Sequence, residues 1–255
     1  MSMAALRSKR KRPSKEKHQL VNKLDINEGV FDRNTLIRLS KLFSGGIVSS
    51  IYFKIARGKE ADVYLADSGA KIDAGYVAVK IFRIETSSFV KRVDYMQGDP
   101  RFGKIKGSTF ALVSEWCKKE YGNLVLASGA GAHVPRPYVF NGNVLAMELI
   151  GEEGKPSNTL RQEGTNEPEK TLDFIIEDVK KLYSTELVHA DLSEYNILMK
   201  GTIPYFIDFG QAVLLKHPRA MEFLKRDIRN VLAYFSKNYS IERKFDDVLE
   251  YVCRQ

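Results

Sequence analysis

The sequence predicts an α+β fold in which a β-rich half precedes a helix-rich half. Three runs of β-branched and aromatic residues, at residues 47–56, 61–67 and 76–82, are separated by glycine-containing turns, a pattern typical of consecutive antiparallel strands. After residue 151 the apolar residues recur instead at helical spacing. The chain has 255 residues, 44% hydrophobic and 28% charged, which is enough to bury a core in one two-lobed domain or two small ones.

Two helices are predicted within the β-rich half. Residues 31–46 place apolar side chains at helical spacing and end in Gly45-Gly46, which predicts a short helix. A longer helix is predicted from Ser108, because the apolar residues after it repeat at helical spacing: Phe110, Val113, Cys117 and Leu124. Residues 83–107 show no period and are rich in Ser, Gly, Lys and Arg, so we interpret them as a flexible insertion and a place for self-phosphorylation.

The remaining elements follow from turn residues and periodicity. A hairpin is predicted over residues 138–150, with Asn141-Gly142 in its turn. An apolar stripe predicts a helix over 171–185, formed by Leu172, Ile175, Ile176, Val179, Leu182 and Tyr183. Two short strands are expected to fold back across Gly201, and two last helices are expected at about 217–237 and 241–252.

Charge is concentrated at the N-terminus. The net charge is +8, and residues 1–18 hold seven Lys/Arg and one Glu, a net +6, which leaves +2 for the other 237 residues. Such a run is usually a solvated arm, and it is also able to contact RNA phosphates or an acidic partner. The folded part therefore carries no charge signal for nucleic-acid binding.

Several classes of protein are excluded by composition. No apolar run approaches the ~18 residues of a transmembrane helix, and no apolar segment of a secretory signal follows the basic start. The two cysteines, Cys117 and Cys253, lie far apart and outside any metal-ligand spacing. We expect a cytoplasmic protein with reduced thiols and no membrane partner.

A lysine and a glutamate of the β-rich half are candidates for one ion pair. Lys80 lies inside the third apolar run, either as an edge-strand lysine that deters aggregation or as a phosphate-binding lysine. Glu120 falls three residues after Cys117 and four before Leu124, on the apolar face of its predicted helix. Either it escapes to solvent, or it needs a cation to offset desolvation, for which Lys80 is the natural partner.

The turn between the first two strands contains Gly58, Lys59 and Glu60. If Lys80 lies beneath this turn, the backbone N–H groups of the turn are placed to hold a β- or γ-phosphate. A single glycine is a weak signal, so this interpretation depends on Lys80.

The stretch "LVHADLSEYNILMKGTIPYFIDFG", residues 187–210, carries the densest polar chemistry. Asp191 is predicted in a loop, where it can accept the proton of an attacking hydroxyl or hold that hydroxyl in place. Asn196 and Asp208 supply hard oxygen ligands that suit Mg²⁺, and the two short strands bring them together. His189 is expected to support the loop through hydrogen bonds.

These motifs, in this order, resemble those of the protein-kinase fold: "VAVK", an inward helical Glu, "HxDxxxxN" and "DFG". Ala190 stands where ordinary kinases usually have arginine. "GKEADVY", "VHADLSEYNIL" and "IDFGQAV" are most similar to the RIO family of atypical kinases, in particular its RIO-one subfamily, over roughly residues 45–240.

The resemblance implies a two-lobed kinase-like architecture. It consists of a basic arm with a short helix at 1–45, an N-lobe with the hinge at 46–150, and a C-lobe at 151–255 that lacks the usual activation segment and peptide platform. It also implies that Lys80 holds the α- and β-phosphates and pairs with Glu120.

The resemblance assigns the remaining site residues as well. Asp191 is the catalytic Asp, Asn196 and Asp208 bind magnesium, and Lys80 and Asp208 act with Asp191 in catalysis. The nucleotide contacts would further include Gly58, Lys59, Glu60, Val63, Glu120, Glu148, Ile150 and Glu194, where Glu148 and Ile150 offer hinge backbone groups to adenine. The cofactors implied are ATP and Mg²⁺, with Mn²⁺ as a substitute. Two departures, Ala56-Arg57 and Asp62, fall on the phosphate side.

The function implied is that of a serine/threonine kinase or ATPase, with autophosphorylation, acting on a pre-ribosomal RNA–protein particle in small-subunit maturation. Two alternatives remain: a nucleotide-gated RNA–protein binding module with little catalysis, and a small-molecule kinase like those for aminoglycosides or choline. After "DFG" the chain enters a predicted helix within a few residues, without an Ala-Pro-Glu anchor. We therefore expect slow transfer to generic peptides.

Overall fold

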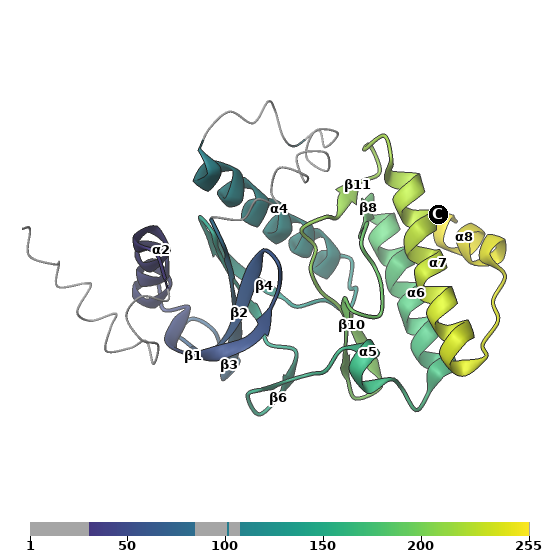
Figure 1. The fold of residues 1–255 in the computed structure, drawn as a ribbon, viewed down its shortest axis with the longest axis horizontal. Coiled ribbons are helices and arrows are strands. Elements are labelled where there is room, and N and C mark those ends of the chain that lie inside the picture. Colours follow the sequence, from purple (N-terminus) through teal and green to yellow (C-terminus); the bar gives the residue numbers. More distant parts are fainter. Residues whose placement is uncertain (1–30, 85–100, 102–107, 255) are drawn as a thin grey trace, which may run out of the picture.

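The β-rich half forms one antiparallel sheet in the computed structural model, which describes residues 31–84, 101 and 108–254 (Figure 1). The strand order is β1-β2-β3-β5-β4, and the strands are β1 (Val48–Arg57), β2 (Ala61–Ser68), β3 (Tyr76–Phe82), β4 (Pro137–Asn141) and β5 (Val144–Glu148). The three strands predicted from composition are confirmed to within two residues. The N-terminal arm and most of the predicted 83–107 insertion lie outside the described residues.

The central strand β3 is buried on both faces, which decides where Lys80 points. Because side chains alternate along a strand, Val77, Val79 and Ile81 join the apolar cluster that contains residues of α2 (Arg33–Ser44). Phe82 joins the other cluster, which contains α4 (Thr109–Gly129). Lys80 shares the α4 side, so the edge-strand interpretation of Lys80 is wrong.

Both predicted N-lobe helices are confirmed, and each begins at a capping residue. The Asp32 carboxylate accepts hydrogen bonds from the backbone N–H groups of Asn34 and Thr35, which satisfies the first turn of α2. The Ser108 hydroxyl accepts a bond from the Ala111 N–H at the start of α4. In Figure 1 the two helices lie on opposite sides of the sheet, with α4 toward the helical half.

The β4–β5 turn lies one residue later than predicted. Asn141 pairs with Val144, so Gly142 and Asn143 form the turn, and Gly142 takes a φ of 62° that glycine tolerates. The completely buried Asn143 side chain donates to the Thr35 hydroxyl at 2.8 Å and to the Phe82 carbonyl at 2.9 Å. These bonds tie α2 to the end of β3 and favour Asn143 in the turn.

The second half packs helices around short hairpins. Its helices are α5 (Leu160–Glu163), α6 (Pro168–Ser184), α7 (Ala220–Tyr239) and α8 (Phe245–Cys253). Its strand pairs are β6 (Gly151–Glu152) with β7 (Lys155–Pro156), β8 (Leu187–Val188) with β11 (Val213–Leu214), and β9 (Ile197–Lys200) with β10 (Ile203–Phe206). The predicted hairpin across Gly201 is confirmed. The last two helices begin later than predicted. Ser240, at φ 56°, ends α7, and the side chain of Ile241 in the connection to α8 is buried.

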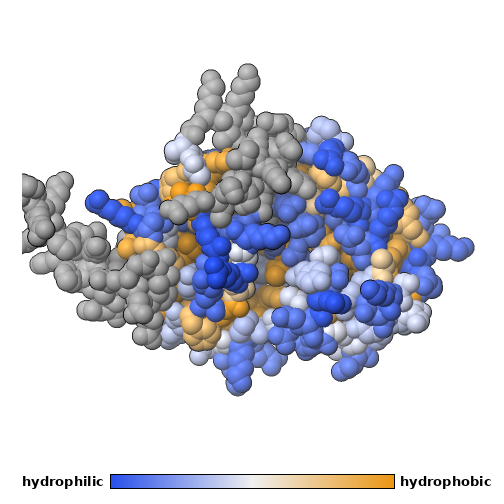
Figure 2. All heavy atoms as spheres, viewed as in Figure 1, coloured by the Kyte–Doolittle hydropathy of each residue, from blue (hydrophilic) through white to orange (hydrophobic). Residues whose placement is uncertain are grey.

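The larger apolar cluster joins the two halves. It contains Trp116, Cys117 and Leu124 of α4 together with Leu172 of α6 and Phe223 of α7. The helix that faces Lys80 is therefore packed against the helical half. On the face drawn in Figure 2, hydrophilic side chains cover most of the described surface of that half. Among the described residues, no helix combines the length and the hydropathy needed to cross a bilayer.

Candidate active site

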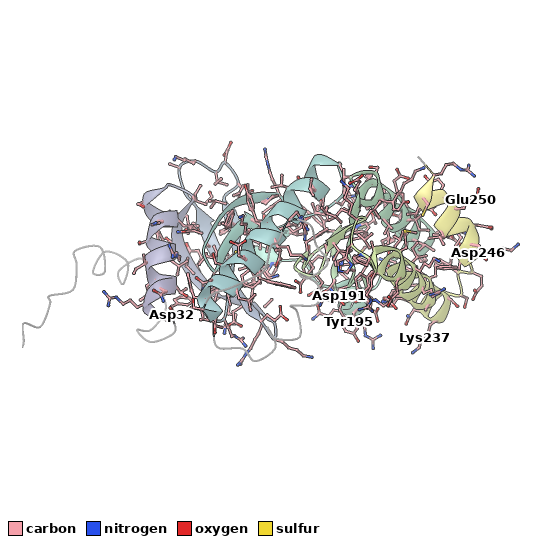
Figure 3. The ribbon with its side chains drawn as sticks, turned by 90° about the horizontal axis from the view of Figure 1, so that it is seen from above. Asp32, Asp191, Tyr195, Lys237, Asp246 and Glu250 are labelled. Carbon is pink, nitrogen blue, oxygen red and sulfur yellow. The ribbon has the colours of Figure 1, made fainter. Side chains whose placement is uncertain are left out.

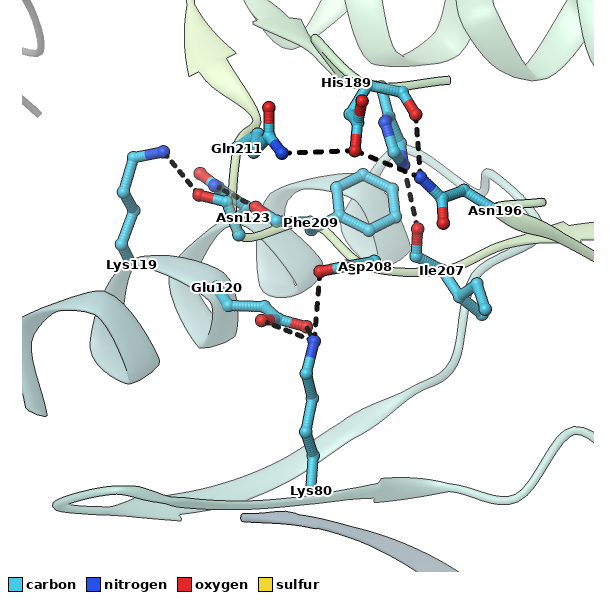
Figure 4. A network of polar contacts seen from close by, with 12 residues as sticks. Lys80, Lys119, Glu120, Asn123, His189, Asn196, Ile207, Asp208, Phe209 and Gln211 are labelled. Atoms are coloured by element: carbon cyan, nitrogen blue, oxygen red, sulfur yellow. Dashed lines mark hydrogen bonds and ion pairs between the residues drawn. The ribbon is translucent and has the colours of Figure 1, made fainter. Parts of the chain in front are cut away.

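Three charged residues from β3, α4 and the loop after β10 meet in one cluster (Figure 4). The Lys80 Nζ lies 2.6 and 2.9 Å from the two carboxylate oxygens of Glu120, and 3.1 Å from Oδ1 of Asp208. Lys80 is 8% exposed and Glu120 is 1% exposed, so the predicted pair is confirmed as a buried one. The Asp208 side chain is about half exposed.

The electrostatics of the cluster keep Lys80 charged. Burial alone would lower the pKa of Lys80, but the charges of Asp208 and Glu120 raise it above its usual value. Burial raises the pKa of Glu120, and Lys80 opposes that shift. A buried ion pair costs desolvation and is kept only with good hydrogen-bond geometry, which the short contacts to Lys80 provide.

The second part of the site is the loop after β8. Asn196 Nδ2 donates to the Asp191 carbonyl at 2.8 Å and to Asp191 Oδ2 at 3.3 Å. Gln211 Nε2 donates to the same Oδ2 at 3.2 Å. The Asp191 carboxylate is thus oriented by two side-chain amides from two different loops. Figure 3 places Asp191 and Tyr195 where the sheet half and the helical half meet.

Helix α7 holds the loop that carries Asp191 through hydrogen bonds to the loop backbone. The Asp227 carboxylate accepts the N–H groups of Ala190 at 2.7 Å and of Leu192 at 3.1 Å. Asn230 donates to the Leu192 carbonyl at 3.2 Å, and Arg226 donates to the Ala190 carbonyl. Burial raises the pKa of Asp227 to about 7, although the two backbone N–H donors oppose the shift. Ala190, at φ 62°, is held in a strained conformation by these bonds.

His189 supports the loop through a hydrogen bond, as predicted. Its Nε2 lies 3.0 Å from the Ile207 carbonyl, so Nε2 carries the proton and donates. The ring is 2% exposed and meets the Phe209 ring edge-on at 4.7 Å. Burial lowers the pKa of His189 to about 4, against the Ile207 carbonyl and the Asp208 charge, which raise it. His189 is therefore neutral in the folded protein near pH 7.

The stability that His189 contributes is expected to depend on pH. The folded-state pKa of about 4 lies below the ordinary 6.5, so the contribution is fully present above pH 6.5 and is lost as the pH falls towards 4. The shift corresponds to about 3 kcal/mol. In urea unfolding, the stability difference between wild type and His189→Gln should shrink by about this amount between pH 7 and 4.

Asp227 also makes the free energy of unfolding depend on pH, in the opposite direction to His189. Because Asp227 is present in wild type and in His189→Gln, its contribution cancels when the two proteins are compared at each pH. Because the folded-state pKa of Asp227 is raised from 3.8 to about 7, its contribution is lost as the pH rises through that range. A difference between the two proteins that stays constant from pH 7 to 4 would contradict the buried, neutral state of His189.

The predicted phosphate turn lies at the end of β3, where the Glu60 carbonyl accepts the Arg83 N–H at 2.8 Å, and one of its own N–H groups is already used. Gly58 N–H donates to the Ala61 carbonyl at 2.9 Å and closes the turn, so it is not the phosphate donor that we expected. The N–H groups of Lys59 and Glu60 remain candidates. Val63 pairs directly with Lys80 across β2 and β3. Val63, which we predicted to contact the nucleotide, therefore lies beside the aliphatic part of the Lys80 side chain.

Asp62, one of the two departures from the family pattern, forms ion pairs with two basic side chains. The Asp62 carboxylate lies 2.5 Å from Arg83 Nη2 and 2.9 Å from Lys54 Nζ. Burial would raise the pKa of Asp62, but the hydrogen bonds from Arg83 and Lys54 lower it overall. Asp62 therefore ties β1 and the end of β3 together beside the phosphate turn.

Of the predicted hinge residues, Glu148 is the last residue of β5 and Ile150 follows the strand. The Glu148 N–H donates to the Arg136 carbonyl at 2.8 Å, and the Ile150 carbonyl accepts the Ser157 N–H at 2.9 Å. The opposite groups, the Glu148 carbonyl and the Ile150 N–H, are those left for adenine in our assignment. Glu194 lies in the same loop as Asp191, where its carbonyl accepts the Arg161 N–H at 3.0 Å.

The chemistry of the donors fits a magnesium ion held with a nucleotide. Asn196 commits its Nδ2 to Asp191, which leaves the amide oxygen Oδ1 on the other side, and Asp208 offers a carboxylate. Mg²⁺ is commonly bound by one or two such oxygens plus substrate phosphates. In the described part of the chain, no group of three or more His, Cys, Asp or Glu residues is placed to hold a metal ion by itself.

Several residues that build the site were missed from the sequence. Asp227 lies on the apolar stripe of α7 with Phe223, Leu224 and Val231, so the argument that found Glu120 would have found it too. Lys119 and Asn123 are buried on α4, and Gln211 follows "DFG" directly. Their partners are backbone carbonyls or a side chain of a distant loop, which no periodicity reveals.

Comparisons with known proteins show which family the chain is similar to. A RIO domain model matches residues 62–248. The RIO-type serine/threonine-protein kinase Rio1 of Haloferax volcanii is 38% identical over 227 residues, 89% of this chain and 77% of that protein. The Rio1 of Methanocaldococcus jannaschii is 38% identical over 239 residues, 93% of this chain and 80% of that protein.

Solved structures support the same fold. The Rio2 kinase from Chaetomium thermophilum, in an ADP/Mg²⁺-phosphoaspartate complex, has a TM-score of 0.68 at 21% identity and covers 90% of this chain and 71% of that chain. This likeness shows the two-lobed, kinase-like fold that the sequence predicted. Together with the match over residues 62–248 and the identity to the Rio1 proteins, it leads to one assignment: the chain belongs to the RIO1 family of atypical serine/threonine kinases.

Proposed function

We propose that this protein transfers the γ-phosphoryl group of magnesium-bound ATP to serine or threonine hydroxyls, including its own. The observation that carries the proposal is the contact of Lys80 with both Glu120 and Asp208, beside an Asp191 that is oriented by Asn196 and Gln211. Phosphoryl transfer needs little covalent chemistry and depends on positioning and charge stabilisation. These residues supply both.

Lys80 couples phosphate binding to metal binding. A lysine ammonium has three N–H donors, and they are directed at Glu120 and Asp208. An arriving phosphate oxygen takes the donor given to Asp208, because the Glu120 contacts are shorter and buried. The Asp208 carboxylate is then available as a metal ligand together with Asn196 Oδ1.

The charge balance of the site favours a divalent cation. The carboxylates of Glu120, Asp208 and Asp191 outnumber the ammonium groups of Lys80 and Lys119, whose charge also acts on Glu120. ATP adds further negative charge. A bound Mg²⁺ supplies the neutralisation of phosphate charge that phosphoryl transfer requires, and the RIO kinase complex with ADP and Mg²⁺ supports this cofactor pair.

Asp191 is the residue that handles the attacking hydroxyl. Its Oδ2 accepts bonds from Asn196 and Gln211, so rotation of the carboxylate is restricted. A carboxylate fixed in this way orients the hydroxyl and accepts its proton as the bond to phosphorus forms.

ATP hydrolysis is the second candidate activity, and the short connection after Gly210 favours it. Only residues 211–219 separate Gly210 from α7, and they contain the two-residue strand β11. An extended peptide has no platform on this connection. We propose that water competes with hydroxyl acceptors, and that Asp208 serves as a minor acceptor whose acyl phosphate is then hydrolysed by water to phosphate.

The cellular setting is proposed from the family. We infer a cytoplasmic role in small-ribosomal-subunit maturation on an RNA–protein particle, with residues 1–18 as an RNA-contacting arm that lies outside the described residues. Mn²⁺ is a proposed substitute for Mg²⁺.

One assay separates the candidate activities. The purified chain is incubated with γ-labelled ATP and Mg²⁺, alone or with a generic basic protein, an aminoglycoside or choline. We expect label on the chain itself, measurable free phosphate, and transfer to the basic protein well below the roughly 1–100 per second of ordinary kinases. Label on the aminoglycoside or choline alone would make the protein a small-molecule kinase, and no turnover at all would favour the binding module.

A further inference from the structure

One face of α4 contacts two different parts of the site. Trp116, Lys119, Glu120 and Asn123 lie on this face, at the three- and four-residue spacing that places side chains together on a helix. Glu120 faces Lys80. The other three face the backbone of residues 209–212, directly after Asp208.

Lys119 is a buried cation aimed at backbone oxygens. Its side chain is 2% exposed, although it is a lysine in the middle of a helix. Its Nζ donates to the Gly210 carbonyl at 2.8 Å and to the Ala212 carbonyl at 2.7 Å, and it lies 5.1 Å from the centre of the Trp116 ring. Burial of an ammonium is costly, so these bonds are a strong constraint on both partners.

Asn123 adds two more bonds to the same loop. Its completely buried Nδ2 donates to the Phe209 carbonyl at 2.8 Å and to the Ala212 carbonyl at 3.0 Å. Its Oδ1 accepts a bond from Arg101 at 2.7 Å. The amide is therefore fixed in the orientation that donates to the loop (Figure 4).

Steric contact reinforces the hydrogen bonds. A Cβ atom on Gly210 would lie 2.8 Å from Trp116 Nε1, so the loop backbone approaches α4 as closely as glycine permits. Asp208 itself has a φ of 64° and a side chain that is about half exposed. Its carboxylate is thus placed by the backbone that follows it, and this backbone is bound to α4.

We propose that Lys119 and Asn123 are positioning residues that join α4 and residues 209–212 into one unit, so that the Lys80–Glu120 pair and the Asp208 metal ligand are assembled or lost together. The same loop carries Gln211, which orients Asp191, so the unit extends to the hydroxyl side of the site. In kinases the orientation of the corresponding helix is a point of control; here that helix cannot swing away without breaking four buried hydrogen bonds. This inference rests on the proposed function.

The test measures ADP affinity with Mg²⁺ and with EDTA for wild type, Lys119→Met and Asn123→Leu. Both changes keep a side chain of similar length and remove the donors. The gain in affinity that Mg²⁺ brings should fall at least about tenfold, the equivalent of one charge-assisted hydrogen bond, whereas affinity in EDTA should change little. Lys118→Met is the matched control, since Lys118 is exposed on the same helix and pairs with Glu115; it should behave like wild type.

Two results would overturn the inference: a wild-type Mg²⁺ effect in both folded variants, or an equal loss with Mg²⁺ and with EDTA, which indicates general destabilisation. Hydrogen exchange of the wild-type protein tests the same unit without substitution. The Ala212 amide should open only together with the amides of α4 around Lys119, and independent opening would contradict the proposal. If wild type itself gains no ADP affinity from Mg²⁺, the proposed function fails and this inference fails with it.

Discussion

Asp191→Asn is expected to reduce phosphoryl transfer by roughly 10²–10⁴-fold, the usual contribution of a positioned acid or base, while leaving Mg²⁺·ADP affinity close to wild type. The asparagine keeps an oxygen that accepts the bonds now donated by Asn196 and Gln211. It cannot accept a proton. The variant therefore separates the proton-accepting role of Asp191 from its role in loop structure.

The measurement is single-turnover autophosphorylation and phosphate release with labelled ATP, alongside ADP binding by calorimetry. Asp191→Ala should show the same loss of rate with somewhat lower stability, because the Asn196 and Gln211 amides lose an acceptor. Glu250→Gln, at an exposed position of α8, serves as a control for the loss of a surface charge. If Asp191→Asn loses ADP affinity in proportion to its loss of rate, Asp191 belongs to the nucleotide site instead.

The sequence predicted the parts of this site that depend on local pattern. Lys80 stands in a strand whose alternation sets its face, and Glu120 stands on a helix whose apolar stripe sets its burial. Period and composition left two interpretations open for each residue, and the 2.6 Å contact between them decides both. The spacing of Asp191, Asn196 and Asp208 was also a sufficient guide, because one hairpin and two short loops bring the three residues into one region.

The parts that were missed depend on tertiary contacts with backbone. Lys119, Asn123 and Asp227 bind carbonyl or N–H groups of loops far away in sequence, and a backbone partner leaves no mark in the amino-acid order. The Gly58 N–H was wrongly expected to remain available because its closure onto Ala61 is a turn geometry that glycine permits but does not specify. A buried polar residue on an apolar helix stripe is the one general signal that was available for Asp227.

Asp208→Asn is expected to remove the gain in ADP affinity that Mg²⁺ provides. Substitution of a residue that only hydrogen-bonds a metal ligand costs roughly 10–100-fold in metal affinity, and the loss of a direct carboxylate ligand should reach at least the upper end. Asparagine is the appropriate substitution because it tolerates the φ of 64° at this position. Asp208→Ala would add backbone strain of roughly 1–2 kcal/mol, so the effect of the lost metal ligand could not be separated from the effect of the strain.

The effect of Asp208→Asn on ADP affinity without metal is expected to have the opposite sign, which makes the prediction more specific. In EDTA the Asp208 carboxylate repels the phosphates and occupies a donor of Lys80 at 3.1 Å, so Asp208→Asn should bind metal-free ADP at least as well as wild type does. Glu120→Gln should behave differently, because it leaves Asp208 in place and removes the buried partner of Lys80, which lowers ADP affinity and stability with or without metal. An Asp208→Asn protein with an undiminished Mg²⁺ effect would show that the metal is held elsewhere. A loss of affinity confined to EDTA would show that Asp208 acts on the nucleotide through Lys80 and not through the metal.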